Sequence, residues 1–107
     1  MVEDLSRFQL NALLIINEIG SPYGLRIKNE LEEYYGEEVN HGRLYPNLDD
    51  LIDAGYVDKS KRDKRTNEYA INDAGKEALR EIFQWQANKA PKVFAQVEPN
   101  PTRSESE

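Results

Sequence analysis

Two short β-type segments that enclose a basic loop constrain the fold of this chain more than any other feature. Residues 56–60 and 67–71 have the composition and the flanking residues of strands. The predicted inward side chains are those of Val57, Tyr69 and Ile71. Most of the loop of residues 61–66 lies in a run, Lys59 to Arg65, with five positive charges and one negative charge. The two segments therefore predict a β-hairpin with a basic tip.

The basic run is distinctive because the rest of the chain is acidic. The 107 residues contain 14 Lys and Arg against 20 Asp and Glu, which gives a net charge of −6. Because the seven residues of the run contribute +4 to this total, the other 100 residues carry −10. A uniformly basic nucleic-acid binder is excluded. The run read alone is typical of a solvated loop, whereas a basic patch on an acidic molecule indicates a localised binding surface.

Residues 5–19 predict a helix with two apolar sides. The first side contains Phe8, Ala12, Ile15, Ile16 and Ile19. The second side contains Leu10, Leu13 and Leu14. Because apolar residues surround most of this helix, it needs neighbours on two sides. We expect these neighbours to be the domain core and a second copy of the chain.

A turn at residues 20–24 separates this helix from a second one, which we expect to end at Tyr35 before Gly36. The third helix, residues 40–54, has the clearest start, because Asn40 can accept a hydrogen bond from a free backbone N–H group. Its apolar stripe consists of Leu44, Leu48, Leu51 and Ile52. Gly55 is expected to end it.

A fourth helix is expected after the hairpin, with Asn72 and Asp73 at its start. Its apolar stripe consists of Leu79, Ile82, Phe83 and Gln86. Pro91 is expected to end this helix. Residues 98–107 are expected to be disordered because they have nothing to bury.

This order of elements is that of a winged helix-turn-helix with one appended helix. The predicted fold class is therefore mainly α with a small β-hairpin. We expect residues 1–71 to form a winged helix-turn-helix DNA-binding domain. Residues 72–97 then form a C-terminal dimerisation helix and extension, and residues 98–107 a disordered tail.

Several functions are disfavoured by composition. The chain has no cysteine and a single histidine, His41, so no transition-metal site and no cofactor are expected. The longest apolar run, residues 12–16, is far shorter than the ~20 residues that span a bilayer. No phosphate loop, nucleophile elbow or paired-acid motif is present, so we expect no enzyme activity. With no signal peptide recognisable, a cytoplasmic location and no membrane partner are expected.

The stretch of residues 41–57, HGRLYPNLDDLIDAGYV, resembles the recognition helix of the PadR family of transcriptional regulators. Residues 22–24 and 68–75 are also similar to motifs of this family, and the resemblance covers roughly residues 5–86. The short final helix is similar to the small type of the family, and the acidic composition to haloarchaeal proteins. The resemblance implies a homodimeric regulator, most simply a repressor, on a pseudo-palindromic DNA operator.

The outward side of helix 40–54 carries the candidate base-reading groups. Gly42 and Pro46 let the backbone approach the groove floor, although Pro46 alone is also consistent with a kinked surface helix. Arg43 is suited to guanine and Asn47 to adenine. Tyr45 and His41 are better placed for phosphates. Asp49, Asp50 and Asp53 depart from the pattern of a DNA-binding helix, so we expect its N-terminal end to enter the groove.

The basic wing, residues 59–67, is expected to contact the minor groove or its phosphates. The predicted DNA-binding residues are His41, Arg43, Tyr45, Pro46, Asn47, Lys61, Arg62, Lys64 and Arg65. The predicted dimer interface consists of Leu10, Leu13, Leu14, Leu79, Ile82, Phe83 and Gln86.

Three alternatives remain open at this point. The two apolar stripes could instead complete the core of a monomer. Trp85 is consistent either with interface packing or with a pocket for a small-molecule effector, and an ionic effector is equally open. The acidic net charge favours a second function, a winged-helix module that contacts proteins of a transcription complex.

Overall fold

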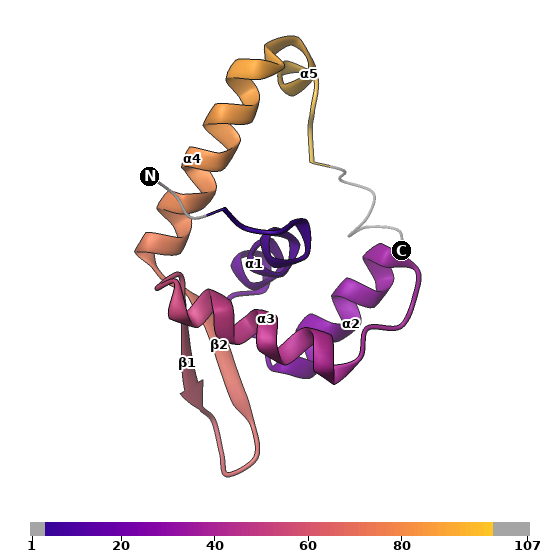
Figure 1. Ribbon diagram of the computed structural model, residues 1–107, viewed down its shortest axis with the longest axis vertical. Helices are drawn as coiled ribbons and strands as arrows, with labels where there is room; N and C mark the ends of the chain where they lie inside the picture. Colours follow the sequence, from indigo (N-terminus) through magenta and orange to yellow (C-terminus); the bar gives the residue numbers. More distant parts are fainter. Residues whose placement is uncertain (1–3, 100–107) are drawn as a thin grey trace.

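The computed structural model describes residues 4–99. Five helices and one two-stranded antiparallel sheet make up this part of the chain (Figure 1). Their bounds are α1 Arg7–Ile19, α2 Gly24–Tyr35, α3 His41–Asp53, β1 Val57–Lys61, β2 Asn67–Ile71, α4 Asp73–Lys89 and α5 Pro91–Ala95. The predicted class, mainly α with a small hairpin, is confirmed. Within residues 4–99, no helix is both long and apolar enough to cross a membrane.

Helix α1 begins at Arg7, two residues later than its hydrophobic pattern predicts, because Ser6 forms a capping box with Gln9. The Ser6 hydroxyl accepts from the Gln9 backbone N–H group, and the Gln9 side chain accepts from the Ser6 N–H group, each at 3.1 Å. This reciprocal pair satisfies two N–H groups that the start of a helix leaves free.

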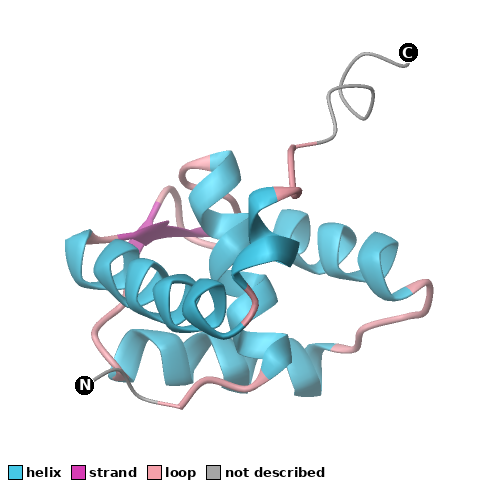
Figure 2. Ribbon diagram, turned by 90° about the horizontal axis from the view of Figure 1, so that it is seen from above, coloured by secondary structure: helices cyan, strands magenta, loops and turns pink. Residues whose placement is uncertain are grey.

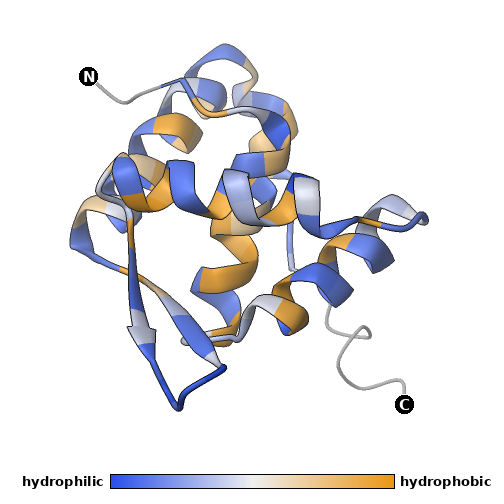
Figure 3. Cartoon of the chain, turned by 60° about the horizontal axis from the view of Figure 1, so that its bottom comes forward, coloured by the Kyte–Doolittle hydropathy of each residue, from blue (hydrophilic) through white to orange (hydrophobic). Residues whose placement is uncertain are grey.

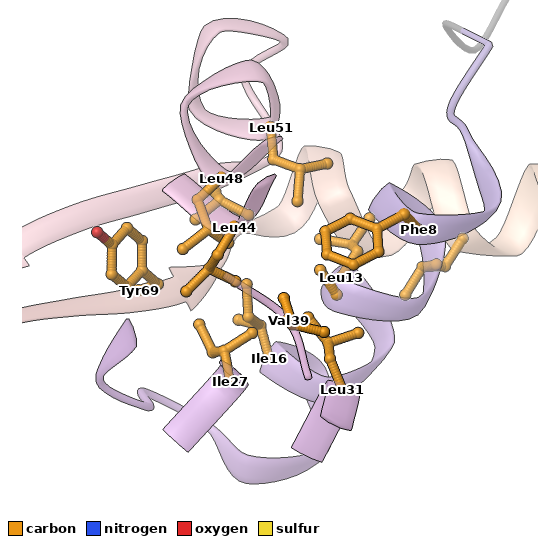
Figure 4. Packing of buried hydrophobic residues seen from close by; sticks show 13 residues of the cluster. Phe8, Leu13, Ile16, Ile27, Leu31, Val39, Leu44, Leu48, Leu51 and Tyr69 are labelled. Atoms are coloured by element: carbon orange, nitrogen blue, oxygen red, sulfur yellow. The ribbon is translucent and has the colours of Figure 1, made fainter. Parts of the chain in front are cut away.

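Helices α1, α2 and α3 surround one hydrophobic core, to which the hairpin contributes Val57 and Tyr69 (Figure 4). Leu44, Leu48 and Leu51 of α3 are fully buried there, as its periodicity predicts. Replacing one of these leucines with alanine removes apolar contacts and leaves a cavity, which costs about 2–5 kcal/mol. The core therefore fixes which face of α3 is left for solvent.

The hairpin pairs Val57 with Ile71 at its base and Lys61 with Asn67 near its tip. It is also tied to the turn before α2. The Tyr69 N–H group donates to the Pro22 carbonyl at 3.0 Å, and Tyr23 forms an isolated bridge with Glu68. The wing is thus attached to the helix-turn-helix along one edge of β2.

Helix α4 starts on the hairpin and then leaves the rest of the molecule (Figure 1). Asn72 caps it by accepting from the Gly75 N–H group at 2.9 Å. As predicted, it ends just before Pro91, but the chain then forms the short helix α5, which its sequence did not indicate. Figure 2 shows the short strands as a small part of a mostly helical molecule. The predicted disordered tail lies, from residue 100 on, outside the described residues.

Two residues predicted for the dimer interface lie in the core of a single chain, and the prediction is corrected for them. Leu13 has no exposed surface and Leu79 is 7% exposed. For Leu13 the reason is that α1 is the central helix, with α2, α3 and β2 packed around it. The other predicted interface residues keep part of their surface exposed: Leu10, Leu14, Ile82, Phe83 and Gln86.

Candidate nucleic-acid interface

The first two turns of α3 present the predicted outward face. Asn40 caps the helix, since its side-chain oxygen accepts from the Arg43 N–H group at 2.8 Å. His41, Gly42, Arg43 and Pro46 are all exposed. A β-carbon on Gly42 would meet only the Asn40 side-chain oxygen, at 3.4 Å. The backbone here is thus open to close approach.

Arg43 is exposed, but its guanidinium group lies back over the ring of Phe8. Its central carbon is 4.0 Å from the Phe8 ring centroid and 5.6 Å from that of Tyr35. These two rings are stacked with centroids 5.9 Å apart. A cation over an aromatic face is attracted by the ring quadrupole. Arg43 therefore has a defined resting position on α1 and α2.

Asn47 is half-buried at the edge of the same face and is held at both ends of its carboxamide. Its nitrogen donates to the Arg43 carbonyl at 2.7 Å, and its oxygen accepts from Gln9 Nε2 at 2.9 Å. Gln9 Nε2 also donates to Asp50 Oδ2 at 3.2 Å. The orientation of Asn47 thus depends on α1.

Tyr45 lies in a hollow between α2, α3 and the wing. The volume of this hollow is about 250 Å³. Its lining residues are Tyr23, Gly24, Leu25, Tyr45, Arg65, Thr66, Asn67 and Tyr69. The Tyr45 ring is 5.4 Å from that of His41, centroid to centroid. Helix α2 begins at this hollow without a side-chain cap.

The basic tip of the hairpin projects into solvent (Figure 3). Lys61, Arg62, Lys64 and Arg65 are all exposed. Arg62 forms an ion pair: its Nη1 donates to Glu68 Oε2 at 3.0 Å, and its guanidinium lies 5.3 Å from the Tyr23 ring centroid. The hydrogen bond from Arg62 thus competes with any phosphate for the same guanidinium.

Asp63 stabilises the turn at the tip of the hairpin. Its carboxylate accepts from the Arg65 N–H group at 2.9 Å. This bond, and a second one from the Thr66 side chain, lower the pKa of Asp63 below its usual value. The ionised Asp63 therefore holds the turn that presents Lys64 and Arg65.

The acidic residues of α3 lie beyond its first two turns. Asp49, Asp50 and Asp53 are exposed on the later turns. Burial raises the pKa of Tyr69, and the nearby Tyr45 and Asp49 raise it further. The N-terminal turns of α3, with His41, Gly42 and Arg43, and its acidic turns are separate parts of the helix.

A second hollow, of about 540 Å³, separates the start of α1 from α4. It is lined by Leu5, Leu10, Ile82 and Trp85 together with Asp4, Arg7, Glu81 and Gln86. Trp85 is 63% exposed there. Among residues 4–99, no three His, Asp or Glu side chains are grouped so that they could hold a metal ion.

Gln9 escaped the sequence analysis, and Tyr23, Gly24 and Glu68 lie in the motifs that it noted but were given no role in the site. The pattern from Ser6 to Gln9 is a capping-box signal that could have indicated the role of Gln9 at the start of α1. The contact of Gln9 with Asn47, 38 positions away, has no local signal.

Three helices with a polar, capped third helix, followed by a hairpin with exposed cations, define a winged helix-turn-helix protein of the nucleic-acid-binding class. Comparison with known proteins agrees with this class. The model of the transcriptional regulator PadR-like family matches residues 12–81. The chain belongs to this family and is a DNA-binding regulator.

Solved structures of RosR from H. salinarum are similar to this chain. One, from crystals grown from NaBr, is 50% identical with a TM-score of 0.77, covering 97% of this chain and 90% of that one. Another, the complex hsRosR-S1, is 57% identical with a TM-score of 0.75, covering 80% and 76%. The resemblance to haloarchaeal regulators is thus confirmed.

A more distant structure shares the fold alone. F93 from STIV, described as a winged-helix DNA-binding protein, is 17% identical with a TM-score of 0.59, covering 78% of this chain and 88% of that one. The comparison with curated proteins found no match.

Proposed function

We propose that this chain is a homodimeric, sequence-specific repressor that binds a pseudo-palindromic operator. Helix α3, with its cap (residues 40–54), enters the major groove, and the basic wing (residues 59–67) contacts the minor groove and its phosphates. The observation that carries this proposal is that the first turns of α3 and the wing tip border one hollow, where Tyr45 lies close to Arg65, Thr66 and Asn67. Two DNA-contacting elements are thus presented together.

Arg43 and Asn47 are the residues that contact the bases. Arg43 leaves the Phe8 ring and forms a two-pronged pair with a guanine, which offers two acceptors in the major groove. Gly42 and Pro46 allow the helix backbone to come close enough. Tyr45, His41 and the uncapped start of α2 are positioned to bind phosphates around the hollow.

The wing supplies the attraction that an acidic protein otherwise lacks. Lys61, Arg62, Lys64 and Arg65 extend from the molecule, whereas the aspartates of α3 lie on its later turns. Insertion of α3 by its N-terminal end therefore keeps these carboxylates away from the phosphates. Binding is strong only where base contacts add to the wing contacts.

The dimer forms through the exposed apolar surfaces of α1 and α4. Leu10 and Leu14 pack against the edge of the core but stay partly exposed, and Ile82, Phe83 and Gln86 are also only partly covered. The end of α4 has few neighbours within one chain, and Trp85 is exposed beside it. A two-fold axis here sets the two recognition helices about 34 Å apart, one turn of DNA.

Selection of bound fragments from random DNA, at low and at molar salt, tests this proposal. We expect a symmetric consensus with half-sites about ten base pairs apart. Sedimentation is expected to give a dimer at micromolar concentration. A monomer, or DNA binding without any base preference, would refute the proposal. Salt-insensitive binding to a protein, with no DNA selected, would favour the alternative of a protein-interaction module.

A further inference from the structure

A chain of hydrogen bonds links the start of α1 to the outward face of α3. It runs from the Ser6 N–H group to Gln9 Oε1, from Gln9 Nε2 to Asn47 Oδ1, and from Asn47 Nδ2 to the Arg43 carbonyl. The donor–acceptor distances are 3.1, 2.9 and 2.7 Å. These hydrogen bonds join α1 and α3 through the side chains of Gln9 and Asn47, which lie 38 positions apart in the sequence.

Each end of this series of hydrogen bonds is a backbone group that can only donate or can only accept. The backbone N–H group of Ser6 can only donate, so the oxygen of the Gln9 carboxamide must face it. Asp50 accepts from the other side of Gln9, at 3.2 Å, which again requires the nitrogen there. At the far end, the Arg43 carbonyl can only accept, so the nitrogen of Asn47 must face it. Neither carboxamide can turn over without breaking these bonds.

Asn47 keeps unused hydrogen-bonding capacity in this arrangement. A carboxamide has two N–H donors and an oxygen with two lone pairs. One donor is used by Arg43 and one lone pair by Gln9, which leaves one donor and one acceptor. Adenine requires this combination, because its N7 accepts and its N6 amino group donates.

We propose that Gln9 is a positioning residue for base recognition: it fixes the orientation of the Asn47 carboxamide and so determines the base that Asn47 prefers. This inference rests on the proposed function and extends it to a residue of α1, outside the recognition helix. Gln9 does not read a base; it sets which end of Asn47 donates and which accepts.

The test replaces Gln9 with glutamate and, in the same chain, Asp50 with asparagine. A glutamate still accepts from the Ser6 N–H group but cannot donate to Asn47, so the Asn47 oxygen loses its donor and faces a carboxylate. The observed orientation of the Asn47 carboxamide is then no longer favoured. The Asp50→Asn change prevents repulsion between two carboxylates. Asp50→Asn alone keeps Gln9 and is the matched control. Ser6→Ala is the second control, because it weakens the cap of α1 without removing the backbone N–H group of residue 6.

The measurement is base preference, which a purely structural role would leave unchanged. The base pair read by Asn47 is the one whose selection from random DNA is lost in Asn47→Ala. At that pair the Gln9→Glu/Asp50→Asn variant is expected to lose about fivefold or more of the preference, whereas both controls retain it. Adding Asn47→Ala to the double variant is expected to change nothing further. Thermal unfolding verifies folding, and Gln9→Met, of similar size without a donor, replaces the double variant should that one unfold.

Retention of the preference by the Gln9 variants, or by Asn47→Ala in the otherwise unchanged chain, would overturn this inference. Such a result leaves the proposed function standing, because the unaltered protein still selects DNA. Failure of the unaltered protein to select any DNA refutes the proposed function itself, and the inference with it.

Discussion

The hydroxyl group of Tyr45 lies directly against the backbone of Gly24, so closely that no β-carbon fits between them. A β-carbon at residue 24 would be 2.6 Å from the Tyr45 oxygen and 2.9 Å from its ring. Gly24 is the first residue of α2 and Tyr45 lies in α3. The absence of a side chain at Gly24 therefore lets the Tyr45 hydroxyl approach the backbone at the start of α2, beside the wing.

Gly24→Ala is expected to lower the free energy of unfolding by about 1–3 kcal/mol, because the added carbon overpacks this contact. Adding Tyr45→Ala removes the clash, so the double variant should lose less stability than the sum of the two single changes. Urea denaturation of the four proteins measures this. Strict additivity would show that Tyr45 does not meet residue 24.

Gly42→Ala is the matched comparison, with the opposite effect on stability. Its β-carbon has room, and alanine is favoured over glycine in a helix by up to about 1 kcal/mol. We expect a chain of equal or higher stability that binds DNA more weakly, because the new methyl group stands between the helix and the groove floor. Unchanged affinity in a binding titration would argue against insertion by this end of α3.

Replacing Arg62 and Arg65 with alanine is expected to weaken binding to all DNA sequences alike. With roughly three phosphate contacts in each of two wings, log K should fall with log salt with a slope near −5. The double variant loses about four of these contacts in the dimer, so the slope should become shallower by about 3 to 4. Affinities measured across a salt series give both slopes, and equal slopes would remove the wing from the mechanism.

Glu68→Gln is expected to tighten binding, because it releases Arg62 from its ion pair. Exposed ion pairs are weak, so we expect a gain of about two- to fivefold per wing, for operator and random DNA alike. Glu77→Gln is the control: it removes an equal charge that pairs with Arg80 at 2.9 Å, on α4. A gain of the same size in both variants would assign the effect to net charge alone.

Arg43→Ala is expected to relax specificity at one base pair by about 1–3 kcal/mol. Arg43→Lys keeps the charge but loses the two-pronged geometry, so it should bind random DNA normally and still lose the preference. Competition titrations with single-base operator variants measure this. A lysine variant with full preference would reduce Arg43 to a phosphate contact.

Stability is expected to fall at alkaline pH through Tyr69. Its pKa is raised in the folded state by burial, so above pH ~10 the unfolded chain releases the proton first. The stabilisation is complete below that pH and is lost as pH rises through the folded pKa. Urea midpoints between pH 8 and 11 should therefore decline less in Tyr69→Phe than in the unaltered chain. Equal declines of the urea midpoint in the two proteins would assign the pH dependence to other ionisable groups.

The recognition helix could be predicted closely because its signals are local. Asn40 as cap, the leucine spacing and Gly55 as terminator lie within one short segment, and the structure places each as expected. The bounds of β2 followed for the same reason, whereas β1 begins and ends one residue later than predicted. Helix α5 was missed because a helix of five residues carries too little periodicity to recognise.

The sequence-based predictions that were wrong or missing concern residues whose packing depends on segments far apart in the chain. Leu13 was assigned to an interface because one helix face was taken as the core, whereas α1 is covered on several sides. The position of Arg43 over Phe8 and the bond from Gln9 to Asn47 join residues far apart in the chain. Side-chain partners of this kind follow from the assembled fold and not from any local pattern.

The bond between the Tyr69 N–H group and the Pro22 carbonyl has a consequence for the choice of operator. It ties the hairpin to the turn before α2, so the protein sets the spacing between α3 and the wing, the two elements that we propose contact DNA. Tracts with a suitable groove width and helical twist meet this spacing at a lower deformation energy. Base pairs that no side chain touches should thus contribute to the selection of the site.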